Sequence, residues 1–300
     1  MKQTARVLGF ILGGGILISQ AVKGISYLLA SKLVPSFGWL LFSLTLGIIA
    51  IAVQILCWTM IMRDLGASIS LRQAMTGYVL NFLPRYIPGS VWGYFSRAEW
   101  LKKHYSIDYS VSHLGSIIEI LSGLFSSLIS VLLFVPQGIS QRERIITGTG
   151  LFLLLVLLWI FLKKTSVIPS LRKISNPFFG FSIRLNVWLF STLLLTLNWL
   201  IYGFIVYGTV KSVADRQVTF STLEWVQYSG LFSFSWLIGF LSWFFPAGLG
   251  PRDWLLAQGL FFLKSIPYGM AYLIAVLTRF LGILSEIVWV AFNTWMYRKG

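Results

Sequence analysis

Charged side chains are rare in this sequence, so the few that lie in its apolar parts indicate where chemistry can occur. Hydrophobic residues make up 57% of the 300 positions and charged residues only 11%. Ionisable groups at the depth of a bilayer are costly unless they pair or face water, so they usually mark a functional cavity. Those that fall within or between the apolar segments include Arg85, Arg97, Glu119, Arg252, Asp253, Arg279 and Glu286. We take them as candidates for lining a cavity that binds the charged part of a substrate.

The stretch "WFFPAGLGPRDWLLAQGLFFLK", residues 243–264, breaks an apolar run and adds charge at the same place. The residues that interrupt it are Pro246, Gly248, Gly250 and Pro251. Proline is well suited to the first turn of a helix, so a new helix should begin at Pro251. Free N–H groups at that helix start, with Arg252 beside them, suit an anion such as phosphate. Asp253 should cap this helix or orient Arg252, since it would repel a phosphate.

A second stretch, "NFLPRYIPGSVWGYFSRAEWLKK" at residues 81–103, repeats the pattern of prolines and glycines followed by an arginine, an acid, Trp and Leu. Its corresponding residues are Asn81, Pro84, Pro88, Gly89 and Gly93. The two stretches are either an internal repeat or similar by chance. Paired broken segments in the two halves of a membrane protein indicate a binding site near the midplane used for alternating access. Arg85, Arg97 and Arg252 would then surround one cavity.

The remaining composition indicates the fold class. Apolar runs are long enough to cross a bilayer, which needs about 20 residues per helix, and alternating strands are absent. The sequence therefore predicts an all-α integral membrane protein: one transmembrane domain over 1–300, with broken or re-entrant segments at about 73–103 and 247–264. We expect no soluble domain. The long helices are expected near 7–30, 37–62, 111–135, 145–163, 186–210, 224–245 and 268–297.

Orientation follows from the positive charge, which totals +15 net. Lys and Arg are enriched in cytoplasmic loops. The connection Lys163–Arg184 carries more of them than Arg142–Arg144, which predicts that the first is cytoplasmic and the second is not. The same count predicts a cytoplasmic N-terminus in a multi-pass protein of the cell membrane.

Several other kinds of chemistry lack the residues they need. Cys57 is the single cysteine, and His104 and His113 have no second ligand at metal-binding spacing. We therefore expect no metal site and no cofactor. Nothing resembles a nucleotide-binding motif, and no nucleic-acid partner is expected.

Four segments together resemble the lysylphosphatidylglycerol synthase transmembrane-region family, whose members are also called flippase-like membrane proteins. They are "NFLPRYIPGSVWGYFSRAEWL", "SHLGSIIEILSGLF", "FFPAGLGPRDWLLAQGLF" and "AVLTRFLGIL". The resemblance covers roughly 70–290 and places Glu119, Arg252 and Arg279 at positions where the family has charged residues. This chain departs from the family pattern at Ala247, where a glycine is usual, and at Asp253, where a glutamate is usual.

The resemblance implies a bundle of about eight helices with two re-entrant hairpins that moves lipids or lipid-linked sugars between leaflets. Lipid aminoacylation is not expected, because the family's enzymes carry it out in a soluble domain. Three hypotheses remain. The chain is a flippase for an anionic phospholipid or polyprenyl-phosphate sugar, a non-transporting membrane partner of a glycosyltransferase, or a membrane-embedded lipid-phosphate transferase. In the first, Glu119 and Arg279 would be charged partners in the cavity. The sequence does not predict the oligomeric state.

Overall fold

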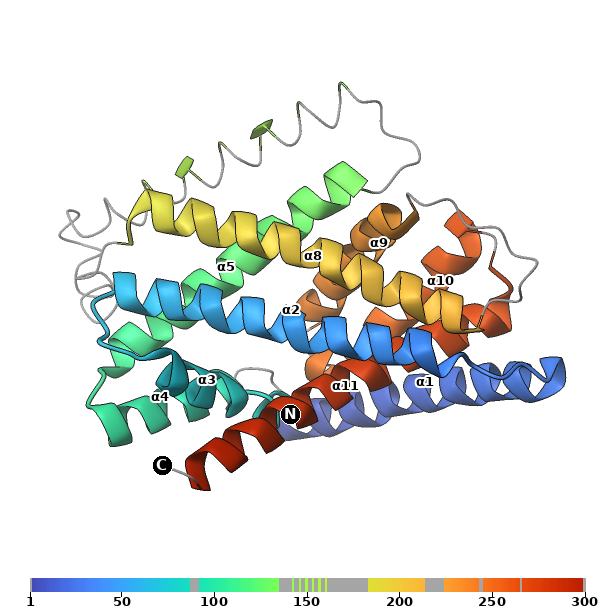
Figure 1. The fold of residues 1–300 in the computed structure, drawn as a ribbon, viewed down its shortest axis with the longest axis horizontal. Helices are drawn as coiled ribbons and strands as arrows, with labels where there is room; N and C mark the ends of the chain where they lie inside the picture. The colour runs from blue at the N-terminus through green and yellow to red at the C-terminus, as the bar shows by residue number, and fades with distance from the viewer. Residues whose placement is uncertain are drawn as a thin grey trace.

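The computed structural model describes residues 2–86, 92–134, 183–213, 224–242, 245–264 and 266–298, with isolated positions between 142 and 160. Throughout these ranges the regular structure is helical, without strands. Five helices in the described part are long and apolar enough to cross a membrane. The predicted fold class, a polytopic helical bundle, is confirmed (Figure 1).

The long helices begin and end close to the predicted positions, because their lengths follow the apolar runs. They are α1 (Lys2–Ser31), α2 (Phe37–Asp64), α5 (Tyr109–Phe134), α8 (Leu185–Val213) and α11 (Tyr268–Arg298). A further helix, α9 (Glu224–Leu241), ends earlier than the sequence predicts. Most of the helix expected at 145–163, and nearly all of Lys163–Arg184, lies outside the described residues, as do 143 and 144.

Each broken segment contains two helices with a 3-10 turn in the chain between them. The first consists of α3 (Leu71–Val79), the 3-10 turn η1 (Pro84–Tyr86) and α4 (Trp92–Tyr105). The second consists of α9, the 3-10 turn η3 (Pro246–Gly248) and α10 (Pro251–Lys264). We call them the first and the second hairpin. Pro88 and Gly89 lie outside the described residues.

The two hairpins lie toward opposite ends of the bundle, and their turns meet inside it. In Figure 1, α3 and α4 lie near one end of α2, whereas α9 and α10 lie near the other. The turns η1 and η3 contact each other. An inverted repeat would produce this arrangement, although the helices surrounding the hairpins differ in length.

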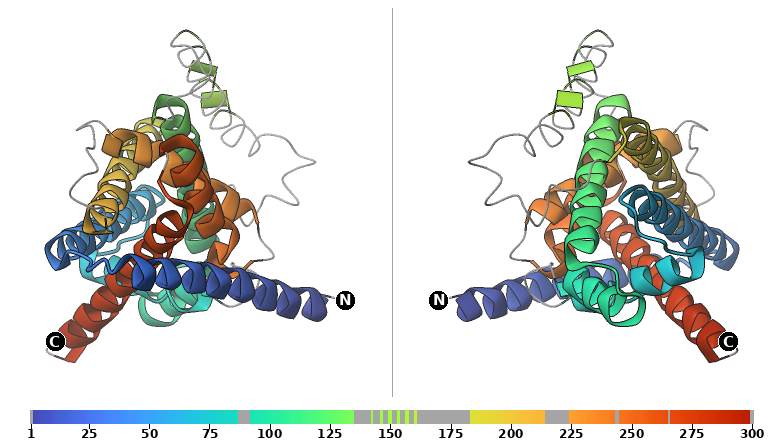
Figure 2. Two further views of the ribbon diagram at one scale, coloured as in Figure 1. Left: turned by 90° about the vertical axis from the view of Figure 1, so that its right-hand side faces the viewer. Right: turned by 90° about the vertical axis from the view of Figure 1, so that its left-hand side faces the viewer.

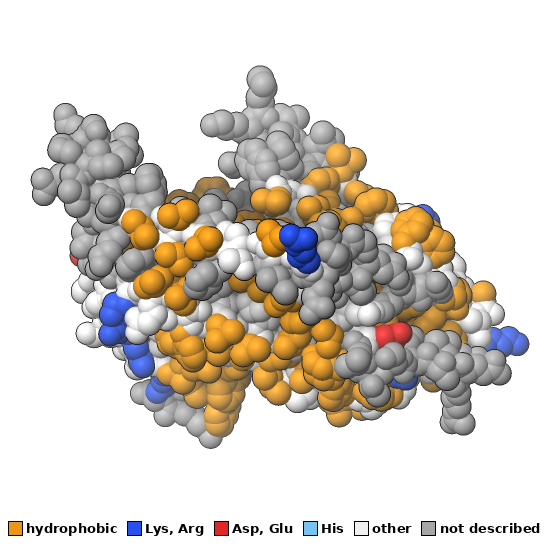
Figure 3. All heavy atoms as spheres, turned by 90° about the horizontal axis from the view of Figure 1, so that it is seen from above, with side chains coloured by type: hydrophobic (Ala, Val, Ile, Leu, Met, Phe, Trp, Pro, Cys, Tyr) orange, Lys and Arg blue, Asp and Glu red, His pale blue; other side chains and the backbone are white. Residues whose placement is uncertain are grey.

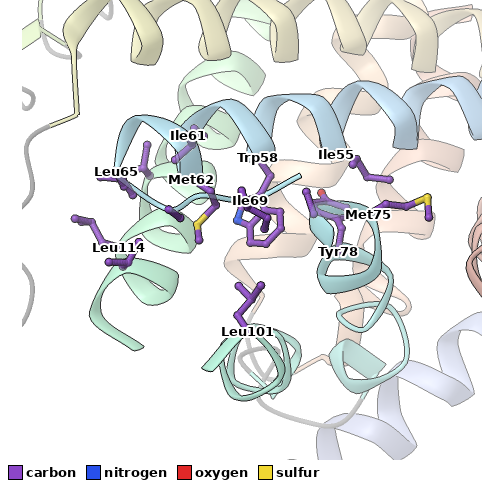
Figure 4. Packing of buried hydrophobic residues seen from close by; sticks show 14 of the residues in the cluster. Ile55, Trp58, Ile61, Met62, Leu65, Ile69, Met75, Tyr78, Leu101 and Leu114 are labelled. Atoms are coloured by element: carbon purple, nitrogen blue, oxygen red, sulfur yellow. The ribbon is translucent and has the colours of Figure 1, made fainter. Parts of the chain in front are cut away.

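Two clusters of buried hydrophobic residues hold the hairpins in place. Around the first hairpin, Trp58 of α2 packs with Tyr78 of α3 and Leu101 of α4, with Leu114 of α5 in the same cluster (Figure 4). Around the second, side chains of α8, α9, α10 and α11 form a separate cluster. Helix α1 packs along α11 and contacts α10 and η3, lying across the flank of the bundle (Figure 2).

The distribution of polarity is that of a protein surrounded by lipid. Large apolar side chains such as Leu29 and Phe262 are more than two-thirds exposed, and hydrophobic side chains cover much of the described surface in Figure 3. Meanwhile Ser122, Ser126 and Ser130 of α5 are fully buried. Small polar side chains between helices and apolar ones outside are typical of membrane bundles. The protein is a multi-pass membrane protein.

Candidate functional site

A cavity of about 250 Å³ lies where the two hairpin turns meet. A single water needs only about 10–15 Å³, so this space holds a group of head-group size. Its wall is formed by residues of both turns, η1 and η3, and of the helices α2, α3, α4, α5, α8, α9, α10 and α11. Of the charged residues expected from the sequence, those lining it are Arg85, Glu119, Arg252, Arg279 and Glu286.

The second hairpin turns sharply because three of the four residues from 247 to 250 adopt left-handed backbone conformations. Their φ angles are 49° at Ala247, 65° at Gly248 and 90° at Gly250. Glycine accepts this region freely, whereas alanine is strained there. A Cβ at Gly248 would also lie 3.0 Å from the Cα of Gly239. Ala247, one of the two positions where this chain departs from the family pattern, therefore has a strained backbone.

Helix α10 begins at Pro251, as the sequence predicts. Its first main-chain bond runs from the N–H of Trp254 to the carbonyl oxygen of Gly250, at 2.8 Å. The Nε2 of Gln20, in α1, donates to the same carbonyl at 3.4 Å. Gly13 of α1 faces the turn so closely that a Cβ there would lie 2.7 Å from the carbonyl oxygen of Leu249. Helix α1 thus supports the break from outside the cavity.

Arg252 lines the cavity from the first turn of α10. Its guanidinium carbon lies 4.7 Å from the centre of the Phe232 ring, a cation–π contact. Within the described part of the chain, no carboxylate lies within ion-pair distance of this side chain. Gly239 of α9 permits the close approach, since a Cβ there would lie 2.7 Å from that of Arg252.

Asp253 is buried behind the cavity wall, and its carboxylate accepts two hydrogen bonds. Its Oδ1 accepts a hydrogen bond from the Nε of Arg279 at 2.7 Å, and its Oδ2 accepts from the N–H of Gly250 at 3.4 Å. The second contact caps α10, which is one of the two roles that the sequence suggested. The first directs the charge of Asp253 to Arg279 rather than to Arg252.

Arg97 of α4 lies behind the wall as well. It is fully buried, and its Nη2 donates to the Oε2 of Glu119 at 2.8 Å and to the Oγ of Ser116 at 2.6 Å. Its guanidinium carbon also lies 4.1 Å from the centre of the Trp58 ring. The expected pairing of Glu119 with Arg279 is therefore wrong. Each instead pairs with the short helix that precedes its own helix in the chain, Glu119 of α5 with Arg97 of α4 and Arg279 of α11 with Asp253 of α10, because these neighbouring helices pack on each other.

The remaining charged pair joins the first hairpin to α11. Arg85 of η1 bonds to the Oε1 of Glu286, and the hydroxyl of Tyr86 donates to the Oε2 at 3.4 Å. The side chains are 33% and 14% exposed, which makes this pair more accessible than the Arg97–Glu119 and Asp253–Arg279 pairs. Of the pairs that reach the cavity, this is the one that bridges the two hairpin regions.

Asn81, Pro84 and Gly93 shape the first break. Pro84 begins η1, and Asn81 precedes it with its side chain lining the cavity. Gly93 in α4 packs against Asn81 so tightly that a Cβ would lie 1.6 Å from the Oδ1. The glycine is therefore needed for close packing, without an unusual φ angle.

Several cavity residues were missed by the sequence analysis, because they carry no charge. They are Gln54, Tyr78, Tyr94, Asn198, Trp199, Tyr202, Phe232 and Trp236. Gln54 accepts from the hydroxyl of Tyr78 at 3.0 Å and donates to that of Tyr202 at 3.0 Å. The amides within α2 and α8, at Gln54 and Asn198, were the available hints.

The charges around the cavity do not balance. Among the described residues, four arginines and three carboxylates line the cavity or lie directly behind its wall, and they form three ion pairs, which leaves Arg252 without a carboxylate. An unpaired guanidinium in a cavity attracts an anion and is suited to bond to two phosphate oxygens. In the described ranges, no group of three His, Cys, Asp or Glu side chains is placed to hold a metal ion.

Comparison with known proteins agrees with this architecture. Residues 7–288 match the family model described as the lysylphosphatidylglycerol synthase TM region. The match spans most of the chain, so the chain belongs to that family. A search of curated proteins finds no match.

Proposed function

We propose that this member of the lysylphosphatidylglycerol synthase transmembrane family moves an anionic lipid between the leaflets of the cell membrane. The phosphate of the lipid head group binds at Arg252 and the start of α10, while the lipid tails stay in the bilayer. The observation that carries the proposal is the unpaired arginine in a cavity whose other charges are neutralised.

The position of the cavity also supports lipid transport. Two broken helix pairs approach from opposite ends of the bundle, and the turn of each reaches the cavity. Non-helical backbone at membrane depth is tolerated where it lines a polar cavity, and transporters use such breaks at their binding sites. The apolar exterior lets lipid tails remain outside while the polar head group crosses through the interior.

Transport by the purified protein in proteoliposomes tests the proposal. Fluorescent phosphatidylglycerol is added to one leaflet, and its loss to the other is followed with and without the protein. The Arg252→Lys variant keeps the positive charge but loses the planar guanidinium, which can donate two parallel hydrogen bonds to a phosphate. We therefore expect transport to fall by at least about tenfold. The thermal stability of the variant should stay close to that of the original protein.

The matched control is Arg72→Lys. Arg72 is exposed, lies outside the cavity wall and bonds to the main-chain oxygen of Met296. This variant should transport normally. Normal transport by Arg252→Lys would refute the role of Arg252. No transport by the original protein, together with co-purification of a glycosyltransferase, would favour a partner subunit instead.

A further inference from the structure

A lysine lies within the apolar span of α1, on the outside of the bundle. Lys23 is exposed and belongs to the segment Ile11–Ser31, one of the helices long and apolar enough to cross a membrane. Within the described part of the chain, no carboxylate lies within ion-pair distance of it. A charge on the lipid-facing side of a membrane helix is costly unless water or a counter-ion meets it. Lys23 therefore indicates a place where an anion is favoured.

The ammonium group of Lys23 lies over two tyrosines at the start of α11. Its Nζ is 5.2 Å from the centre of the Tyr272 ring and 6.0 Å from that of Tyr268. The hydroxyls of the two tyrosines are hydrogen-bonded to each other at 2.6 Å. The Nε2 of Gln258, in α10, donates to both hydroxyl oxygens, at 3.1 Å and 3.2 Å. We call these four residues, which come from three helices, the outer cluster.

The outer cluster offers hydrogen-bond donors and carries no acidic side chain. An ammonium group donates hydrogen bonds and accepts none. Of the two tyrosine hydroxyls, one donates to the other, which leaves a single O–H group to donate outward. Tyr268 is 41% exposed and Tyr272 only 2%, so the outward donor is that of Tyr268. A cation beside an unused O–H group is satisfied by an anion with several acceptor oxygens, as a phosphate has.

Close packing of α1 on α11 fixes the outer cluster in place. A Cβ at Gly24 would lie 2.8 Å from the Cα of Leu273, and one at Gly269 would lie 2.7 Å from the Cβ of Tyr27. Small residues allow membrane helices to approach in this way. Because Gly24 is the neighbour of Lys23 in the chain, the lysine is presented at a defined position over the rings.

The surroundings of the outer cluster are those of a lipid head group. Trp254 and Phe262 of α10 are 46% and 71% exposed, and the ring of Phe261 lies 5.3 Å from that of Tyr268. Lys23 is about two turns from the end of α1, and Tyr268 is the first residue of α11, so the cluster lies toward one end of the bundle (Figure 1). Lys and Tyr are typical of the head-group depth of a bilayer. An anion with apolar tails matches both parts of this surface.

We propose that the outer cluster binds an anionic phospholipid of the adjacent leaflet. The phosphate lies between Lys23 and the hydroxyl of Tyr268, and the acyl chains follow the exposed side chains of α10. The site is distinct from the cavity, which none of the four residues lines, and it does not depend on the proposed transport. The bound lipid holds α1 against the second hairpin, where Gln20, one turn before Lys23, donates to the carbonyl oxygen of Gly250.

Photolabelling of the purified full chain in detergent tests the site. Phosphatidylglycerol with a diazirine in its acyl chain is titrated onto the protein, crosslinked by light, and located by peptide mass spectrometry. We expect saturable labelling of residues 254–262, with an affinity at least about tenfold higher than that of phosphatidylcholine with the same photoreactive chain. Equal labelling by the two lipids would overturn the proposal, because the negative charge would then not be recognised.

Variants of the outer cluster locate the phosphate. Lys23→Gln removes the charge, so the affinity measured by this labelling should fall about tenfold, the effect of one hydrogen bond to a charged group. Lys23→Arg keeps the charge and should keep the labelling. Tyr268→Phe keeps the ring and removes the outward donor, so it should weaken binding about threefold. Unchanged labelling of Lys23→Gln and Tyr268→Phe, at retained thermal stability, would refute the site.

The matched control is Lys32→Gln, which removes an exposed lysine just beyond the end of the same helix and should leave the labelling unchanged. A contact with a second copy of the chain is the competing occupant of this face. A dimer in detergent that Lys23→Gln dissociates, without lipid labelling at 254–262, would overturn the lipid site. Arg252→Lys should keep this labelling, so a failure of the transport proposal leaves the outer cluster standing.

Discussion

The two hairpins use the same plan with the charges reversed. In each, a 14-residue helix follows the break, and a short connection leads into a long helix that packs on it. One buried ion pair joins the short helix to the long one. At the first hairpin the short helix α4 supplies Arg97 and the long helix α5 supplies Glu119. In the second, the short helix supplies Asp253 and the long helix supplies Arg279.

The difference decides which charge reaches the cavity. Glu119 and Arg279 line it from the long helices, whereas their partners on the short helices are hidden behind the wall. The ion pairs therefore anchor the hairpins and leave one carboxylate, Glu119, and one guanidinium, Arg279, at the cavity surface. Arg252 has no counterpart in this scheme. The second hairpin thus carries both an anchor and a binding group, whereas the first carries an anchor.

The largest expected effect is on the anchor of the first hairpin. Glu119→Gln leaves Arg97 fully buried without a counter-charge, and breaking a buried pair in this way costs about 3–5 kcal/mol. Asp253→Asn leaves Arg279 without its carboxylate, but Arg279 is 7% exposed and lines the cavity, whereas Arg97 is fully buried, so the cost should be smaller, about 2 kcal/mol. Thermal unfolding in detergent measures both.

The double variant Arg97→Gln with Glu119→Gln is the control for this comparison. It removes both charges, so it should be more stable than Glu119→Gln alone. If Asp253→Asn proves as damaging as Glu119→Gln, the two anchors are equivalent and the cavity does not shield Arg279.

A second prediction compares the two breaks themselves. Gly93→Ala puts a Cβ 2.8 Å from the main-chain oxygen of Asn81, and even closer to its side chain, so the first hairpin must shift. Overpacking of this kind costs about 1–3 kcal/mol. Gly282→Ala in α11 is a matched control, since a Cβ there meets nothing within 4 Å. Unchanged thermal stability of Gly93→Ala would show that the close packing is not needed.

At the second break, a substitution should stabilise the protein rather than destabilise it. Ala247 has a φ of 49°, a left-handed conformation that costs an L-residue about 1 kcal/mol or more. Ala247→Gly should therefore stabilise the protein by about 1 kcal/mol, seen as a higher unfolding temperature. Ala50→Gly, in the middle of α2, is the comparison and should destabilise by about 1 kcal/mol. A destabilised Ala247→Gly would mean that the turn is not strained.

The sequence predicted the long helices and the start of α10 well, because both depend on local chemistry. Apolar length determines a membrane helix, and Pro251 determines a helix start. It did not predict the partners of Glu119 and Arg279, because these depend on which helices pack together. The sequence did contain a usable signal for these pairs. Arg97 and Glu119 lie at similar sequence distances on either side of the connection at 106–108, and Asp253 and Arg279 lie likewise on either side of the connection at 265–267.

The neutral part of the cavity wall could not be predicted. Phe232 and Tyr202 look like any other aromatic residue in an apolar helix, and only the packing of α8 against α9 turns them toward Arg252. Even the charged residues gave partial information. Arg97 and Arg252 look alike in the sequence, yet the first is enclosed by a carboxylate and aromatic rings while the second lines the cavity.

The smallest expected effect on stability concerns the pair between the hairpin regions. Arg85 is one-third exposed and Glu286 is 14% exposed, so solvent screens the pair and lowers the cost of losing it. Arg85→Gln should therefore lower the free energy of unfolding by less than about 1 kcal/mol.

The effect of Arg85→Gln on transport should be larger than its effect on stability, because the Arg85–Glu286 pair links η1 to α11 and must adjust if the hairpins move relative to each other. Parallel measurement of thermal unfolding and proteoliposome transport for Arg85→Gln and Glu286→Gln tests this. A loss of stability as large as that of Glu119→Gln would show that the pair is a third anchor rather than a link between two separately anchored hairpins.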